Sequence, residues 1–97
     1  MKPAHFIGGA WVAGQSGKTI DCVDPSTEEV FDRVPAGGVA EIDAAVAAAR
    51  KAFDGGWRQT TGAQRAAILR AVAKGIADNR ERLAALETRD NGKPLAE

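Results

Sequence analysis

Apolar residues recur at spacings of three and four in the last third of the chain, which is typical of one face of an α-helix. The stripe runs through Leu69, Val72, Ile76, Asn79, Leu83, Leu86 and Asp90. It ends at Asn91-Gly92, a helix stop signal, with Pro94 just beyond. We expect this face to lie against a core, where the Asp90 carboxylate would be costly unless a partner neutralised it.

The start of this helical segment is also marked. Thr61 and Gln64 have the spacing of a capping box, in which a hydroxyl and an amide satisfy each other's backbone N–H groups. The pattern leaves open whether the segment breaks near residues 77–79 or continues as one bent helix.

An earlier helix is predicted from about residue 39 to residue 53. Gly38 is its expected N-cap, and Glu41 falls in the first turn, where the helix dipole favours an acid. Four alanines between residues 44 and 48 favour the helix and keep one face thin enough for another element to approach closely. Gly55-Gly56 should end it.

Two antiparallel β-ribbons are predicted before the helices. Gly8-Gly9 suits a tight hairpin turn, and Asp24-Pro25 turns the chain between two alternating segments. The expected strands cover residues 5–7, 10–12, 18–23 and 29–34. The predicted fold class is therefore α/β, with β-ribbons over residues 1–35 followed by a helical part, residues 36–97, of two or three amphipathic helices.

Composition narrows the possible partners and location. The 97 residues can form one domain at most, and 13 basic against 13 acidic residues argue against nucleic acid or an anionic membrane as partner. No apolar run approaches the roughly 20 residues that span a bilayer. The single cysteine, Cys22, fits a reducing compartment, so we expect a cytoplasmic location.

Several residues that could suggest chemistry have simpler interpretations. Residues 14–19 resemble the end of a P-loop, but Val12 replaces its first glycine and a strand, not a helix, is expected to follow. Cys22 is expected to be a small buried filler and His5 a surface residue. The charged run of residues 80–82 and Arg89 are expected to form a solvated helix face.

Four segments in order resemble the NAD(P)-dependent aldehyde dehydrogenases. They are FIGGAWV with the strand and turn SGKTIDCVDPSTEEVFDRVPAG, the helix AEIDAAVAAARKAF, Trp57 with the R-x-x-I-L of residues 65–69, and LETRDNGKP. The resemblance covers essentially the whole chain. It implies that residues 1–97 are a partial N-terminal segment of a cofactor-binding domain in a family whose members are several times longer.

The resemblance also implies an activity whose residues lie outside this chain. Family members oxidise an aldehyde through a cysteine thiolate, transfer a hydride to NAD(P)+ and hydrolyse the thioester with a glutamate as base. We therefore expect no catalytic and no cofactor-binding residue here, and neither the aldehyde nor the choice of NAD or NADP can be read from this segment.

A cation site is the one site that the resemblance assigns to these residues. In many aldehyde dehydrogenases the aspartate equivalent to Asp90 binds Na+ or K+ together with main-chain oxygens that correspond here to Cys22 and Val23. Oxygen donors suit an alkali cation, which would neutralise the carboxylate. The alternative is an aspartate held by backbone N–H groups or by an arginine.

Two functions from different classes follow. The first is the N-terminal segment of an aldehyde dehydrogenase, inactive alone, whose partner is the remainder of that chain. The second is a free-standing helical interaction or oligomerisation module derived from the family. We expect the final residues, PLAE, to begin a new helix, which favours the first. Self-association through exposed apolar faces is expected in either case.

Overall fold

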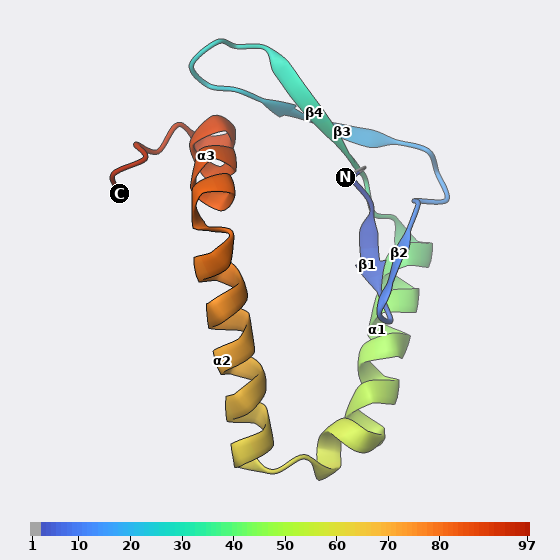
Figure 1. The fold of residues 1–97 in the computed structure, drawn as a ribbon. Coiled ribbons are helices and arrows are strands. Elements are labelled where there is room, and N and C mark those ends of the chain that lie inside the picture. The colour runs from blue at the N-terminus through green and yellow to red at the C-terminus, as the bar shows by residue number, and fades with distance from the viewer. Residues whose placement is uncertain (1–2) are drawn as a thin grey trace. The chain divides into compact units, whose positions relative to one another are not determined.

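The computed structural model describes residues 3–97, whose strands and helices are labelled in Figure 1. These residues fall into two compact units. The first unit contains the described residues up to Cys22 together with Phe31–Gln59. The second contains Val23–Val30 and Thr60–Glu97. Two two-stranded antiparallel sheets precede three α-helices, so the predicted fold class is confirmed.

The first sheet is the hairpin of β1 (His5–Ile7) and β2 (Ala10–Val12). Phe6 pairs with Trp11 across the strands, and their ring centroids lie 4.8 Å apart. Gly8 and Gly9 have φ values of 61° and 83°, the left-handed backbone that a two-residue hairpin loop requires. The predicted hairpin is confirmed.

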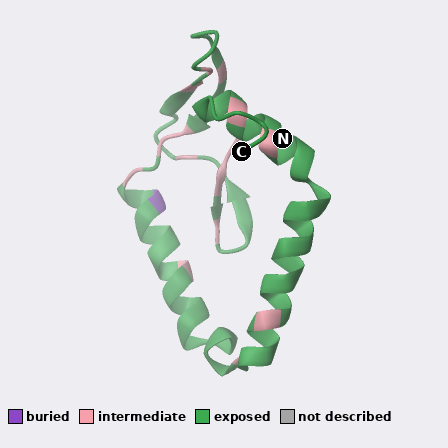
Figure 2. Cartoon of the chain, turned by 90° about the vertical axis from the view of Figure 1, so that its left-hand side faces the viewer, coloured by how far each residue is buried: buried purple, intermediate pink, exposed green. Residues whose placement is uncertain are grey.

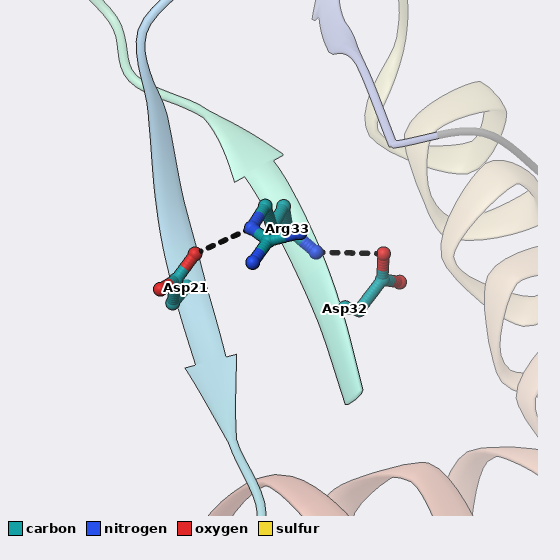
Figure 3. A network of polar contacts seen from close by, with 3 residues as sticks. All are labelled: Asp21, Asp32 and Arg33. Carbon is teal, nitrogen blue, oxygen red and sulfur yellow. Dashed lines mark hydrogen bonds and ion pairs between the residues drawn. The ribbon is translucent and has the colours of Figure 1, made fainter. Parts of the chain in front are cut away.

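The second sheet pairs β3 (Thr19–Val23) with β4 (Val30–Pro35). Asp21 and Arg33 form an ion pair across it, with 2.8 Å between Oδ1 and Nε, and the Arg33 N–H donates to Asp32 Oδ1 (Figure 3). The Ala36 N–H donates to the Lys18 carbonyl at 2.8 Å beyond the strand ends. The residues after Lys18 are thus a strand, as predicted, and not the helix of a P-loop.

Helix α1 (Val39–Asp54) follows, and a 3₁₀ turn, η1 (Gly56–Gln59), completes the first unit. Gly38 is the N-cap and Gly55 the C-cap, as predicted. A Cβ built on Gly8 would lie 3.7 Å from the Ala48 Cβ. The thin alanine face of α1 therefore admits the β1–β2 turn at close range.

In the second unit the helical segment breaks, which settles the question that the pattern left open. Helix α2 (Gly62–Asp78) ends and α3 (Arg80–Asn91) begins on either side of Asn79, whose side-chain amide donates to the Gly75 carbonyl at 2.9 Å. Asn79 thus closes the last turn of α2 with its own side chain.

The end of α3 is a left-handed Gly92 (φ 79°), whose N–H donates to the Thr88 carbonyl at 2.8 Å. The helix expected at PLAE is absent from the described residues. Those last four residues form one turn, closed by the Glu97 N–H on the Pro94 carbonyl at 3.1 Å.

The helices expose their apolar faces. Almost the whole of the helices is coloured as exposed in Figure 2. Within residues 3–97 no hydrophobic side chain is buried, and Leu69 and Ile76 are 69% and 56% exposed. The expectation that the α2–α3 stripe faces a core is therefore wrong for the described chain. A helix buries one face only against a second layer, and neither unit supplies that layer. No described helix has the length and apolar character needed to cross a bilayer.

The capping box of α2 gives a first prediction. The Gln64 N–H donates to Thr61 Oγ1 at 3.1 Å and the Thr61 N–H donates to Gln64 Oε1 at 2.8 Å. Thr61→Ala should cost about 1 kcal/mol of stability, visible as reduced helicity and a lower thermal midpoint in circular dichroism. Thr61→Ser, which keeps the hydroxyl, is the control. Equal behaviour of the two variants would contradict the role of the cap.

Candidate functional site

The three predicted cation ligands lie on two elements. Cys22 and Val23 end β3, where Cys22 is half-buried and Val23 exposed, and Asp90 is exposed in the last turn of α3. Cys22 is counted in the first unit, and Val23 and Asp90 in the second. Cys22, expected to be a buried filler, thus keeps part of its surface exposed.

The donor chemistry of this set suits a hard cation, but the set is small. One carboxylate and two main-chain carbonyls are fewer than the roughly six oxygens that hard cations usually take. No group of three or more His, Cys, Asp or Glu that could hold a metal ion occurs among residues 3–97. The described residues could supply only part of a site, so the cation site stays a prediction.

The Asp90 carboxylate lies on an exposed face of α3, so its expected cost is wrong for the described residues. A carboxylate on an apolar face requires a partner only if that face is covered, and here Asp90 and its neighbours Leu83 and Leu86 are all exposed. Water solvates the carboxylate, so the described chain places no burial cost on it.

The polar contact at the end of α3 is instead made by the preceding residue, Arg89. Its Nε lies 3.9 Å from Asp24 Oδ2, so Arg89 is not only part of a solvated face, as was expected. Residues 80–82 are exposed, as predicted. The contact joins α3 to the turn after β3, and both segments belong to the second unit.

Asp24 is held from several sides. The Ser26 N–H donates to Oδ1 at 2.8 Å, and the side chain of Asp24 is only 17% exposed. Hydrogen bonds from Ser26 lower the pKa of the Asp24 carboxyl most strongly, with Thr27 and the Arg89 charge adding to the effect against partial desolvation. Asp before Pro predicts the turn, but no local signal in the sequence pairs it with Arg89.

Among the described residues of the first unit, Glu41 is the buried polar residue. Its side chain accepts from the Gln15 N–H at 2.7 Å through Oε1 and from the Gly38 N–H at 2.8 Å through Oε2. These backbone donors lower the pKa of the Glu41 carboxyl, Gln15 most strongly, and the nearby His5 acts in the same direction. Glu41 thus ties the β2–β3 loop to the start of α1.

His5 is partly enclosed beside this loop, so its expected surface position is wrong. Its Nε2 is buried and has no hydrogen-bond partner among the described residues. A Cβ built on Gly14 would lie 3.4 Å from Nε2, and one built on Gly37 would lie 3.6 Å from Cε1. A side chain at either position would meet the imidazole at an ordinary van der Waals distance, so Gly14 and Gly37 border His5 without being required there.

Solved structures share the fold of this chain. The NAD+ complex of an aldehyde dehydrogenase from Bacillus cereus matches 99% of this chain with a TM-score of 0.93 and 42% identity, over 20% of its own length. A Staphylococcus aureus betaine aldehyde dehydrogenase variant, solved with NAD+, matches 98% of the chain with a TM-score of 0.93 and 38% identity, over 19% of its own length. The fold is that of one segment of an aldehyde dehydrogenase.

Sequence comparison agrees with the structures. The aldehyde dehydrogenase family model matches residues 11–97. Aminoaldehyde dehydrogenase 2 of Zea mays is 49% identical over 96 residues, which is 95% of this chain and 19% of that protein. Betaine aldehyde dehydrogenase 1 of Oryza sativa subsp. japonica is 45% identical, with the same coverage of both chains.

The chain therefore belongs to the aldehyde dehydrogenase family, and the resemblance seen in its motifs is confirmed. It corresponds to the N-terminal portion of its relatives and spans about a fifth of their length.

Glu41 generates the second prediction. Its folded pKa lies below the ordinary value of 4.5, so its contribution to stability is present above that pH and is lost as the pH falls through the folded value. The thermal midpoint of the chain should fall on acidification, and Glu41→Gln should lower the midpoint at neutral pH and weaken its pH dependence.

Asp43→Asn is the matched control, because Asp43 is an exposed acid in the same helix. It should leave the acid dependence close to that of the unaltered chain. If both variants change the pH dependence equally, Glu41 has no special role.

Proposed function

We propose that this chain is the N-terminal part of an NAD(P)+-dependent aldehyde dehydrogenase, an enzyme that oxidises an aldehyde to a carboxylic acid, and that the segment is inactive alone. The observation that carries the proposal is the match of 99% of the chain to an NAD+-bound aldehyde dehydrogenase at 42% identity. The dinucleotide, NAD or NADP, and the reacting cysteine and glutamate belong to the remaining part of such an enzyme.

The exposed apolar faces support a role as a docking part of that enzyme. Large apolar side chains of α2 and α3 are 37% to 69% exposed: Ile68, Leu69, Val72, Ile76, Leu83 and Leu86. Full burial of one such side chain is worth about 1.5–3 kcal/mol, so covering the set would strongly favour association. We propose the remainder of an aldehyde dehydrogenase chain as the segment that covers them.

The same exposure favours a second candidate, a free-standing interaction module that associates with itself through α2 and α3. An isolated domain rarely leaves such a continuous apolar set in water. The two functions differ in what completes the apolar layer, which is another copy of the chain in one case and the catalytic remainder in the other.

The proposal includes a monovalent cation and a cytoplasmic location. Asp90 and the main-chain oxygens of Cys22 and Val23 would hold Na+ or K+ once the remainder adds further oxygens. The single cysteine supports a reducing compartment.

A chimera tests the proposed function. The segment of the Bacillus cereus enzyme that matches this chain is replaced by the chain itself, and NADH formation is followed with an aldehyde and NAD+. The chimera should be active and the isolated chain inactive. Cys22→Ala in the chimera should keep the activity, because Cys22 is not the nucleophile. A chimera that folds but forms no NADH, or an isolated chain that does form it, would refute the proposal.

Truncation of an exposed leucine tests what covers the helices. Leu69→Ala should change the stability of the isolated chain by no more than about 0.5 kcal/mol, because Leu69 is 69% exposed there. In the chimera it should cost about 2–5 kcal/mol, as a buried leucine does. Chemical denaturation measures both values, and Arg82→Ala should have little effect in either protein.

The second candidate function predicts a different pattern. Leu69→Ala would then dissociate an oligomer of the isolated chain in sedimentation experiments and leave the chimera unaffected.

A further inference from the structure

We propose that Asp24, Pro25, Arg89 and Gly92 form a latch that fixes the end of α3 to the turn after β3 without any bound cation. The four residues come from two segments of the second unit, residues 23–30 and α3. The latch is a property of this chain itself and stands whether or not the proposed function is correct.

The turn side of the latch is shaped by its own hydrogen bonds. The Asp24 N–H donates to the Glu29 carbonyl at 2.9 Å, and the Glu28 N–H donates to the Asp24 carbonyl at 2.8 Å. The Ser26 N–H occupies Asp24 Oδ1, while Oδ2 is the oxygen nearest to Arg89. The Asp24 carboxylate is therefore held in one orientation before α3 contributes anything.

The helix side provides a positive charge at a suitable place. Arg89 lies in the last turn of α3, where the helix dipole favours a cation. Its Nε is 3.9 Å from Asp24 Oδ2, and the Arg89 side chain is 58% exposed against 17% for Asp24. Exposure of the arginine weakens the pair, but the enclosed carboxylate keeps part of the attraction from being screened by water.

An apolar contact completes the latch. A Cβ built on Gly92 would lie 3.1 Å from Cγ of Pro25. That distance is tighter than an ordinary van der Waals contact, so the proline ring sits directly on the helix stop. Two features therefore favour glycine at position 92. One is the left-handed φ of 79°, and the other is the close Pro25 ring, which a Cβ would crowd.

The latch changes what a cation at Asp90 has to do. A cation there was expected to tie the last helix to the strand before the Asp-Pro turn. Arg89 already brings a positive charge to that turn, and the contact of Pro25 with Gly92 needs no charge. The end of α3 is consequently joined to the turn by contacts that need no cation. The link of these contacts to enzyme assembly is the one step that rests on the proposed function.

Amide hydrogen exchange of the isolated chain tests the latch. The Ser26 and Gly92 N–H groups report on its two sides, and exchange is compared in potassium chloride and in choline chloride at equal ionic strength. Protection should be the same in both salts. Arg89→Met should speed exchange of the Ser26 N–H several-fold in both. Arg82→Met, which removes an exposed arginine from the same helix, should not.

A double-mutant cycle tests the apolar contact between Pro25 and Gly92. It does not depend on hydrogen exchange, so it can be used if the amides of the isolated chain exchange too fast to follow. Gly92→Ala is compared with the same change in a Pro25→Ala background through the thermal midpoint of the chimera. The loss should be smaller in the Pro25→Ala background, because only the backbone strain remains.

Two results would overturn the latch. One is equal effects of Arg89→Met and Arg82→Met together with additive effects in the cycle. The other is protection that appears only in potassium chloride and disappears in Asp90→Asn, which would assign the junction to a cation. Neither result bears on the activity of the chimera, so failure of the latch and failure of the proposed function can be told apart.

Discussion

The constraint on which the structure depends is the lack of a second layer over its helices. Neither unit offers a surface that could cover the apolar faces of α1, α2 and α3, and no hydrophobic side chain among residues 3–97 is buried. The hydrophobic effect, which normally dominates folding, therefore contributes little within this chain. Order within each unit must come mainly from hydrogen bonds, caps and turns. The enclosed carboxylates, Glu41 and Asp24, take part in such contacts.

The features predicted correctly are those decided by neighbouring residues. Gly8 and Gly9 define the first hairpin because few other residues adopt the required backbone. Thr61 and Gln64 mark the start of α2 because they have the three-residue spacing of a capping box. Gly92 ends α3 for the same kind of reason. The order of ribbons and helices follows from such local signals, and the family follows from their sequence motifs.

The features missed depend on residues far apart in the sequence. Gln15 reaches Glu41 across 26 positions, and Arg89 meets Asp24 although nothing near either residue indicates the other. Periodicity identifies the apolar face of α2 and α3, but it cannot say what covers that face, and the expected core does not form within residues 3–97. The predicted cation site has the same difficulty, because Asp90 is far along the sequence from Cys22 and Val23.

In both units a carboxylate that accepts backbone N–H groups joins two segments of the chain. In each, a carboxylate accepts a backbone N–H from a loop and is drawn toward a basic side chain or a helix terminus, Glu41 in the first unit and Asp24 in the second. The pKa of both carboxyl groups is lowered, so both contacts strengthen the fold only while the groups are ionised. A segment held in this way can be correctly shaped before its apolar faces are covered. That order suits the proposed docking role, since preformed helices would lose less conformational entropy if a partner buried them.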